Sequence, residues 1–184
     1  AGSYSEHGSE STLWAEWRQE GRIAAFPYGA AGIEIEIDLE TGNLKICNYW
    51  IVDDCGQIIN PKIVKGQAHG GIVHGIGQAI GEVAFYENSN GQLLTGSFMD
   101  YMVPRAGQFP LFNLDSIDVK TLTNPLSIKA GGESGTVAAL ALVGNAVMNA
   151  LDYFEVPELE MPFTAPKIWY AIKSSAKASP SQNN

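Results

Sequence analysis

The 184-residue sequence has little cysteine, little positive charge and no long uninterrupted apolar run. Its two cysteines, Cys47 and Cys55, are too few for a disulfide framework or a four-thiolate zinc site, so we expect free thiols. Eleven Lys and Arg residues against 20 Asp and Glu residues give a net charge of −9, which disfavours nucleic acid and anionic membranes as partners. Apolar stretches such as 136–143 are far shorter than the roughly 20 residues that span a bilayer. The sequence therefore indicates a soluble protein, which we expect in the cytoplasm.

The length suits one domain with a hydrophobic core. A chain of this size buries about 70 % of the surface that its unfolded form exposes. We expect the folded domain over 21–174, preceded by a partly ordered segment over 1–20 and followed by a frayed tail over 175–184. Within the N-terminal segment, 13–18 favours one or two turns of amphipathic helix.

Alternating side chains predict a β-hairpin in the first third of the chain. Apolar and acidic residues alternate with period two over 33–39, as in a strand with one buried and one solvated face. Turn residues at 40–43 and a second β-rich run over 44–52 complete the hairpin. A hairpin-like stretch with an Asn-Gly turn follows at 83–98, and 112–122 predicts another strand.

Helical spacing of apolar residues predicts two main helices, over 62–84 and 136–151. A shorter helix is expected over 165–174, capped by Thr164 with Pro166 in its first turn. We therefore predict an α+β fold in which a mixed or antiparallel sheet packs against the two main helices.

The first main helix carries an unusual number of glycines. Each costs about 1 kcal/mol relative to alanine inside a helix, so another interaction must compensate. Glycines spaced four residues apart clear a helix face, and either a neighbouring backbone or a bulky ligand can then approach. The sequence leaves both interpretations open. The glycines are Gly66, Gly70, Gly71, Gly75, Gly77 and Gly81.

The densest candidate for chemistry is the loop over 129–136, Lys-Ala-Gly-Gly-Glu-Ser-Gly-Thr, which precedes the second main helix. Backbone N–H groups and the helix dipole favour negative charge at this position, so Glu133 could take up a proton or contact a cofactor. Alternatively, Glu133 only complements the dipole and the glycines only form a turn. The loop matches neither a Walker loop nor a nucleophile elbow.

Two other groups of polar residues carry weaker signals. His69 and His74 are five residues apart, so they do not share a helix face as a zinc pair would. Asp53 and Asp54 end a strand and are open to acid–base work or to turn chemistry.

Five stretches together carry a far more specific signal. They lie at 26–29 (Phe-Pro-Tyr-Gly), 52–61 (with Asp-Asp-Cys-Gly and Asn-Pro), 66–79 (Gly-Gln-Ala-His-Gly-Gly), 96–105 (Gly-Ser-Phe-Met-Asp-Tyr) and 129–136. In order and spacing they resemble the C-terminal part of the molybdenum-binding large subunit of the xanthine oxidase family. This family includes xanthine dehydrogenases, aldehyde oxidoreductases and aerobic carbon monoxide dehydrogenases.

The resemblance implies a catalytic site. The family hydroxylates an electron-poor carbon with oxygen from water, at molybdenum held by a pterin dithiolene. On this basis Glu133 is the general base that takes a proton from the metal-bound hydroxyl. Gln67, Gly132 and Lys129 are the implied cofactor-binding residues, and we expect Gln67 and Glu133 to converge on one open face. The substrate would be an aldehyde, an N-heteroaromatic compound or a similar small molecule.

The resemblance also implies missing parts. The family's molybdenum subunit is several times longer than this chain, and its other portion supplies further cofactor contacts and the substrate pocket. Iron–sulfur clusters and flavin would lie on partner domains or chains, because two cysteines cannot ligate a four-thiolate cluster. A bacterial source would favour the pterin cytosine dinucleotide. The alternative is a cofactor-free fragment or interaction domain without activity of its own.

Overall fold

The computed structural model describes Glu16 and residues 24–175. Apart from Glu16, the residues of the predicted helical turns at 13–18 and most of the predicted tail lie outside the described residues. Two strands precede the first main helix, a third strand lies between the two main helices, and these two helices are the longest elements. In order, the elements are β1 (Tyr28–Ile37), β2 (Leu44–Asp54), α1 (Pro61–Ile80), the 3₁₀ turn η1 (Ala106–Gln108), β3 (Asn113–Ile117), α2 (Ser134–Leu151), the 3₁₀ turn η2 (Asp152–Phe154) and α3 (Ala165–Ser174).

The three strands form one mixed sheet in the order β1-β2-β3. β1 and β2 pair antiparallel, so the predicted hairpin is confirmed. β3 runs parallel to β2 along its other edge. Of the two sheet types that the sequence allowed, the mixed one is found. Cys47 and Cys55, on and just after β2, are free thiols as expected.

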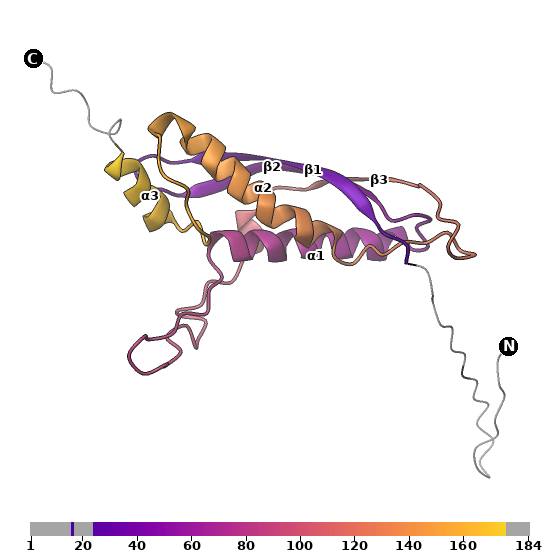
Figure 1. Ribbon diagram of the computed structural model, residues 1–184, viewed down its shortest axis with the longest axis horizontal. Helices are drawn as coiled ribbons and strands as arrows, with labels where there is room; N and C mark the ends of the chain where they lie inside the picture. Colours follow the sequence, from indigo (N-terminus) through magenta and orange to yellow (C-terminus); the bar gives the residue numbers. More distant parts are fainter. Residues whose placement is uncertain (1–15, 17–23, 176–184) are drawn as a thin grey trace, which may run out of the picture.

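Helices α1 and α2 lie on one side of the sheet, and the core fills the space between the two layers (Figure 1). α2 packs on both α1 and β1. α3 lies against the β1–β2 turn, where a Cβ atom on Gly42 would come within 2.1 Å of the Ala165 carbonyl oxygen. The fully buried side chains include Tyr49, Ile72, Ile76, Val143, Val147, Leu151 and Ile168.

Glycines allow α1 and α2 to cross at very short range. A Cβ atom on Gly135 would lie 2.5 Å from the carbonyl oxygen of Ala68. A Cβ atom on Gly75 would lie 2.8 Å from the Cβ atom of Ala139. Part of the glycine content of the first helix therefore serves helix packing.

Gly135→Ala should lower the free energy of unfolding by about 1–3 kcal/mol, because the added methyl group pushes the two helices apart. Gly144→Ala is the matched control on the same helix, since its Cβ atom would make only ordinary contacts 3.7 Å from the Phe163 ring. Alanine should stabilise that position by up to about 1 kcal/mol. Urea unfolding followed by circular dichroism measures both free energies of unfolding. If Gly135→Ala were as stable as Gly144→Ala, the close packing at Gly135 would be contradicted.

The segment after α1 differs from its prediction. α1 begins at Pro61 as the first-turn proline suggests, but it ends at Ile80 rather than near 84. The expected hairpin is reduced to one antiparallel bridge between Tyr86 and Leu93. Residues 82–104 instead form an irregular arm that projects from the layered body (Figure 1). The Asn-Gly turn of this segment therefore does not extend into paired strands.

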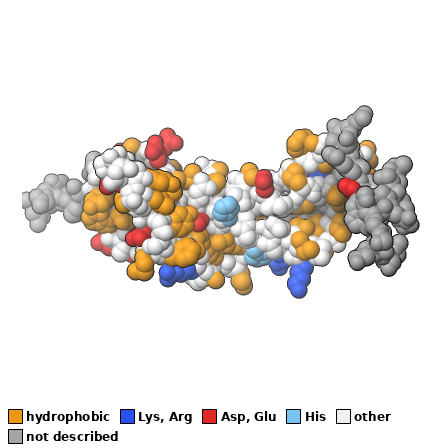
Figure 2. Space-filling view, turned by 90° about the horizontal axis from the view of Figure 1, so that it is seen from below, with side chains coloured by type: hydrophobic (Ala, Val, Ile, Leu, Met, Phe, Trp, Pro, Cys, Tyr) orange, Lys and Arg blue, Asp and Glu red, His pale blue; other side chains and the backbone are white. Residues whose placement is uncertain are grey.

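Apolar side chains gather over the region from which the arm projects (Figure 2). Phe98 and Met99 are 87 % and 93 % exposed. Such a concentration of exposed apolar surface is typical of a region that meets another protein surface.

The later elements match their predictions with shifted ends. The strand expected over 112–122 is β3, which ends at Ile117 because the chain turns so that the Val119 N–H can donate to Asp54 at 3.2 Å. α2 begins two residues earlier than predicted. α3 has the predicted bounds, but the Thr164 side chain makes no capping hydrogen bond.

Within the described part of the chain, one helical stretch, Ser134–Phe154, is long and apolar enough to cross a membrane. Polar residues are scattered along it, so it contains no long uninterrupted apolar run. Core helices of soluble proteins pass the same criterion. Since α2 packs on α1 and β1, we interpret the stretch as a core helix.

Candidate functional site

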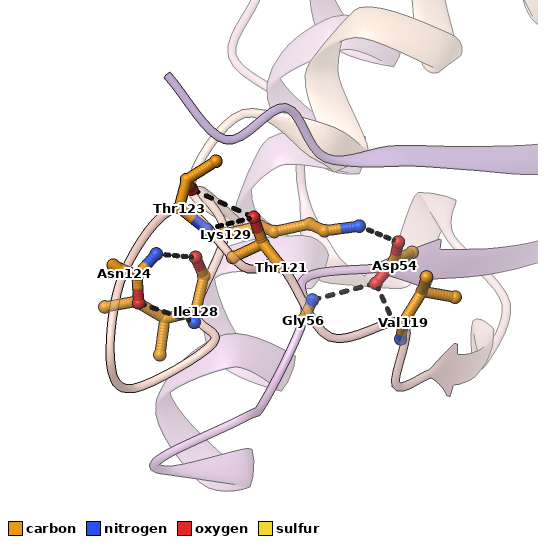
Figure 3. A network of polar contacts seen from close by, with 8 residues as sticks. All are labelled: Asp54, Gly56, Val119, Thr121, Thr123, Asn124, Ile128 and Lys129. Atoms are coloured by element: carbon orange, nitrogen blue, oxygen red, sulfur yellow. Dashed lines mark hydrogen bonds and ion pairs between the residues drawn. The ribbon is translucent and has the colours of Figure 1, made fainter. Parts of the chain in front are cut away.

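A buried ion pair anchors the loop before α2 to the end of β2 (Figure 3). The fully buried carboxylate of Asp54 contacts the ammonium group of Lys129 through Oδ2. Its Oδ1 atom accepts hydrogen bonds from the N–H groups of Gly56 at 2.8 Å and Val119 at 3.2 Å. The Lys129 ammonium also lies 4.8 Å from the ring centroid of Tyr28. Asp54 thus links the end of β2 to the segment after β3, through Val119, and to the loop before α2, through Lys129.

The environment of Asp54 keeps it ionised. Burial raises the pKa of its carboxyl, but the hydrogen bonds from Lys129, Gly56 and Val119 and the charge of Lys129 outweigh burial and lower the pKa overall. The Lys129 side chain is only 8 % exposed. Lys129, expected at the cofactor, therefore has a structural partner within the chain, and its cofactor role stays a prediction.

Backbone hydrogen bonds fix the same loop further. The Lys129 N–H donates to the Cys55 carbonyl at 2.9 Å. The Asn124 side chain donates to the Ile128 carbonyl at 2.9 Å and accepts from its N–H at 3.1 Å (Figure 3). Gly56 has a φ of +62°, a left-handed conformation that favours glycine. These contacts hold the path of the chain over 124–129, just before the glycines that lead to Glu133.

Glu133 immediately precedes α2 and lines a cavity of about 690 Å³. Its carbonyl accepts the N–H of Thr136 at 3.0 Å, but its side chain makes no capping hydrogen bond. Helix capping therefore does not engage the carboxylate. The wall of the cavity combines residues 27–31, Ile51, Asp53, Ala130, Gly132, Glu133, Ser134, Val137 and Ala138.

Asp53 brings a second carboxyl group to this cavity. Tyr49, Ile51 and Asp53 alternate along β2 and share its helix-facing side, whereas Asp54 lies on the opposite side. Burial raises the pKa of Asp53, partly countered by the Ser134 hydroxyl. This raised pKa is unusual for a carboxyl group and suits acid–base work. The sequence left acid–base work and turn chemistry open for Asp53 and Asp54. The strand places the two side chains on opposite faces, so each can have a different role.

The other predicted site residues lie around the crossing of α1 and α2. Gly132 lines the cavity beside Glu133, with no atom within 4 Å of where its Cβ would be. Gln67 is exposed on α1, next to Ala68, whose carbonyl packs against Gly135. Gln67 does not line the cavity itself. Its convergence with Glu133 on one open face stays a prediction.

Four of the glycines of α1 divide into two groups. Gly71 and Gly75 face α2, which accounts for their lack of side chains. Gly66 and Gly70 have no atom within 4 Å of a Cβ position, so helix packing does not explain them. They flank Gln67 and leave bare, accessible backbone beside it. Helix packing therefore accounts for Gly71 and Gly75, whereas a ligand contact at Gly66 and Gly70 stays a prediction.

His69 has hydrogen-bond and ring partners within the chain. His69 Nδ1 lies 2.8 Å from the Lys65 carbonyl oxygen, and its ring packs 5.6 Å from that of Phe112. Across residues 24–175, the structure brings together no group of three His, Cys, Asp or Glu side chains able to hold a metal ion.

Comparison with known proteins identifies the family. Residues 2–110 match the family model described as the molybdopterin cofactor-binding domain. The chain belongs to this family, and the resemblance drawn from its motifs is confirmed.

Individual relatives are large subunits of oxidoreductases. The nicotine 6-hydroxylase large subunit of Paenarthrobacter nicotinovorans is 40 % identical over 148 residues, covering 80 % of this chain and 18 % of that protein. The carbon monoxide dehydrogenase large chain of Hydrogenophaga pseudoflava is 32 % identical over 148 residues, with the same coverage. The crystal structure of quinoline 2-oxidoreductase from Pseudomonas putida 86 matches with a TM-score of 0.76 and 35 % identity, over 80 % of this chain and 19 % of that one. The chain thus spans about a fifth of the length of these relatives, and its fold is that of their cofactor-binding domains.

Proposed function

We propose that the chain is part of the catalytic subunit of a molybdenum hydroxylase that oxidises a small aldehyde, N-heteroaromatic or similar substrate with oxygen from water. The observation that carries the proposal is the Glu133 carboxylate, which is not used for capping and lines a cavity of about 690 Å³. Membership of the molybdopterin cofactor-binding family gives that carboxylate its chemical context. Relatives named for nicotine and quinoline support the substrate class.

The residues present fit a bulky, flat cofactor. Gly66 and Gly70 leave open space along α1 on both sides of the exposed Gln67. The Gln67 amide would hold the cofactor through hydrogen bonds, and Gly132 would admit it beside the base. Lys129 would act on the cofactor mainly by fixing the loop through Asp54. The cytosine dinucleotide form of the pterin is our expectation for a bacterial enzyme.

The proposed mechanism assigns the proton chemistry to Glu133. When bound, the cofactor supplies the metal centre that delivers oxygen from water and accepts two electrons. A carboxylate oxygen of Glu133 takes the proton that this oxygen must lose in order to attack the substrate. The side chains of Ile51 and Val137 line the same cavity and give it apolar surface beside the carboxylate.

The proposal includes the remainder of the molybdenum subunit and iron–sulfur and flavin chains as partners in the cytoplasm. The exposed Phe98 and Met99 of the arm support contact with another protein surface. We place the folded domain at 21–174 within this longer protein.

The test is to purify the full-length subunit with its partners and to measure molybdenum and pterin per subunit. Turnover in ¹⁸O-labelled water should then place the label in the product. Absence of molybdenum from every complex would refute the proposal and favour a cofactor-free interaction domain.

Gly70→Ala offers a separate prediction about the α1 face. The methyl group enters open space, so the free energy of unfolding of the apo-protein should rise by up to about 1 kcal/mol. The same methyl group should obstruct the cofactor and lower the molybdenum content of the purified enzyme. Gly144→Ala controls for the gain in helix propensity away from this face. Unchanged molybdenum content would remove Gly70 from the cofactor site.

A further inference from the structure

Asp53 lies at the wall between two cavities. The larger one contains Glu133 and Ser134. The smaller one, of about 170 Å³, lies between the start of α1 and β3 and includes Lys65 and Asp115. Within the described chain, Ile51 and Asp53 line both cavities, and of these two only Asp53 can carry a proton.

The adjacent residue shows how different the surroundings of Asp53 are. Asp54 is saturated by an ammonium group and two backbone N–H groups. Neither of the two ion pairs found among the described residues involves Asp53. Its polar neighbour is the hydroxyl of Ser134, whose single proton can turn either to the Asp53 carboxyl or to the Gly131 carbonyl, which lies 3.3 Å away. The Asp53 carboxyl thus keeps the capacity to gain and lose a proton.

The groups around Asp53 differ in charge on its two sides. Burial and the charge of Asp53 raise the pKa of Tyr49 to about 12, and burial raises that of Cys55, so both stay neutral near pH 7. Asp54 and Lys129 neutralise each other. The remaining acidic and basic side chains nearby are Glu133 on the larger cavity and Lys65 and Asp115 on the smaller one.

We propose that Asp53 carries protons out of the Glu133 cavity, receiving the proton that Glu133 gains in each turnover and passing it to the smaller cavity. This inference rests on the proposed role of Glu133. In the transfer an O–H bond on Glu133 breaks and an O–H bond on Asp53 forms, through the Ser134 hydroxyl or water. Asp53 then releases the proton to solvent and becomes a carboxylate again. No electrons move, and Glu133 is restored as a base.

The burial of Asp53 favours this role. A carboxyl group with a raised pKa accepts a proton more readily than an exposed aspartate does. Its position on a central strand, between the two cavities, keeps it fixed relative to both.

The experiment uses the cofactor-loaded enzyme carrying Asp53→Asn, which keeps the size of the side chain but cannot take up a proton. Proton release in a single turnover, followed with an indicator dye in weak buffer, should slow at least about tenfold. Molybdenum content and KM should not change, and added imidazole should restore part of the rate. In the infrared, the pH-dependent carbonyl band of the protonated Asp53 should disappear.

Asp118→Asn is the control, because Asp118 is an exposed carboxylate that lines neither cavity. Proton release at the wild-type rate in Asp53→Asn would overturn the inference. Loss of molybdenum would also overturn it, since Asp53 would then support cofactor binding instead. If Glu133→Gln remains active, the proposed function itself fails, whereas an inactive Glu133→Gln with normal proton release in Asp53→Asn refutes only the relay.

Discussion

Glu133→Gln should reduce the turnover rate of the full-length, cofactor-loaded enzyme by about 10²–10⁴-fold. Glutamine has nearly the shape of glutamate, but its amide cannot accept the proton. The carboxylate makes no capping hydrogen bond to α2, so the substitution should leave the helix and the fold intact. Steady-state kinetics with molybdenum analysis measures both effects.

The matched control for this substitution is Glu40→Gln, in the exposed turn between β1 and β2. It makes the same chemical change far from the cavity and should retain wild-type turnover. A Glu133→Gln enzyme with full molybdenum content and wild-type turnover would rule out Glu133 as the base.

The second large effect concerns stability. Lys129→Met should lower the melting temperature at pH 7 by on the order of 10 °C, because it leaves the buried Asp54 carboxylate without its cationic partner. The double variant Asp54→Asn/Lys129→Met should be more stable than Lys129→Met. The amide oxygen of the asparagine that replaces Asp54 can still accept the hydrogen bonds from Gly56 and Val119. Calorimetry of the three proteins measures the effect.

The pH dependence of this loss follows from the lowered pKa of Asp54. In the wild type, the stability contributed by Asp54 is present above the pKa of about 3.9 for an unfolded aspartate and is lost as the pH falls through the lower folded pKa. In Lys129→Met, burial should dominate and raise the pKa of Asp54. Acid should then neutralise the unpaired Asp54 carboxylate and reduce the difference in melting temperature between this variant and the wild type. A difference in melting temperature between the two proteins that stays constant from pH 7 to pH 4 would argue against an ionised, buried Asp54.

Local patterns predicted the elements whose stability is decided locally. The period-two alternation over 33–39 identified β1, and helical spacing identified α1 and α2. The arm over 82–104 shows the limit of local signals, because an isolated hairpin with a favourable Asn-Gly turn is only marginally stable unless another layer packs on it. The parallel pairing of β3 with β2 joins residues far apart in sequence, such as Trp50 and Asn113, and no local signal encodes it.

The candidate site divides in the same way. Glu133 was found because glycines surround it in sequence and a helix follows. The partner of Lys129 could not be found, since Asp54 lies 75 residues earlier in the chain. Asp53 could have been separated from Asp54 by the alternation of buried residues along β2, because Ile51 and Asp53 must then share a side.

The central position of β2 has a consequence for how the protein is made. When a ribosome has synthesised the chain as far as the end of α1, β2 is paired only with β1 and its other edge is still open. β3, which closes that edge, and α2, which covers α1, emerge only after the arm. An open strand edge beside uncovered apolar surface favours aggregation. Nascent chains of this domain therefore need protection during translation until α2 has emerged, and expression plasmids should encode at least residues 24–175 as one unit.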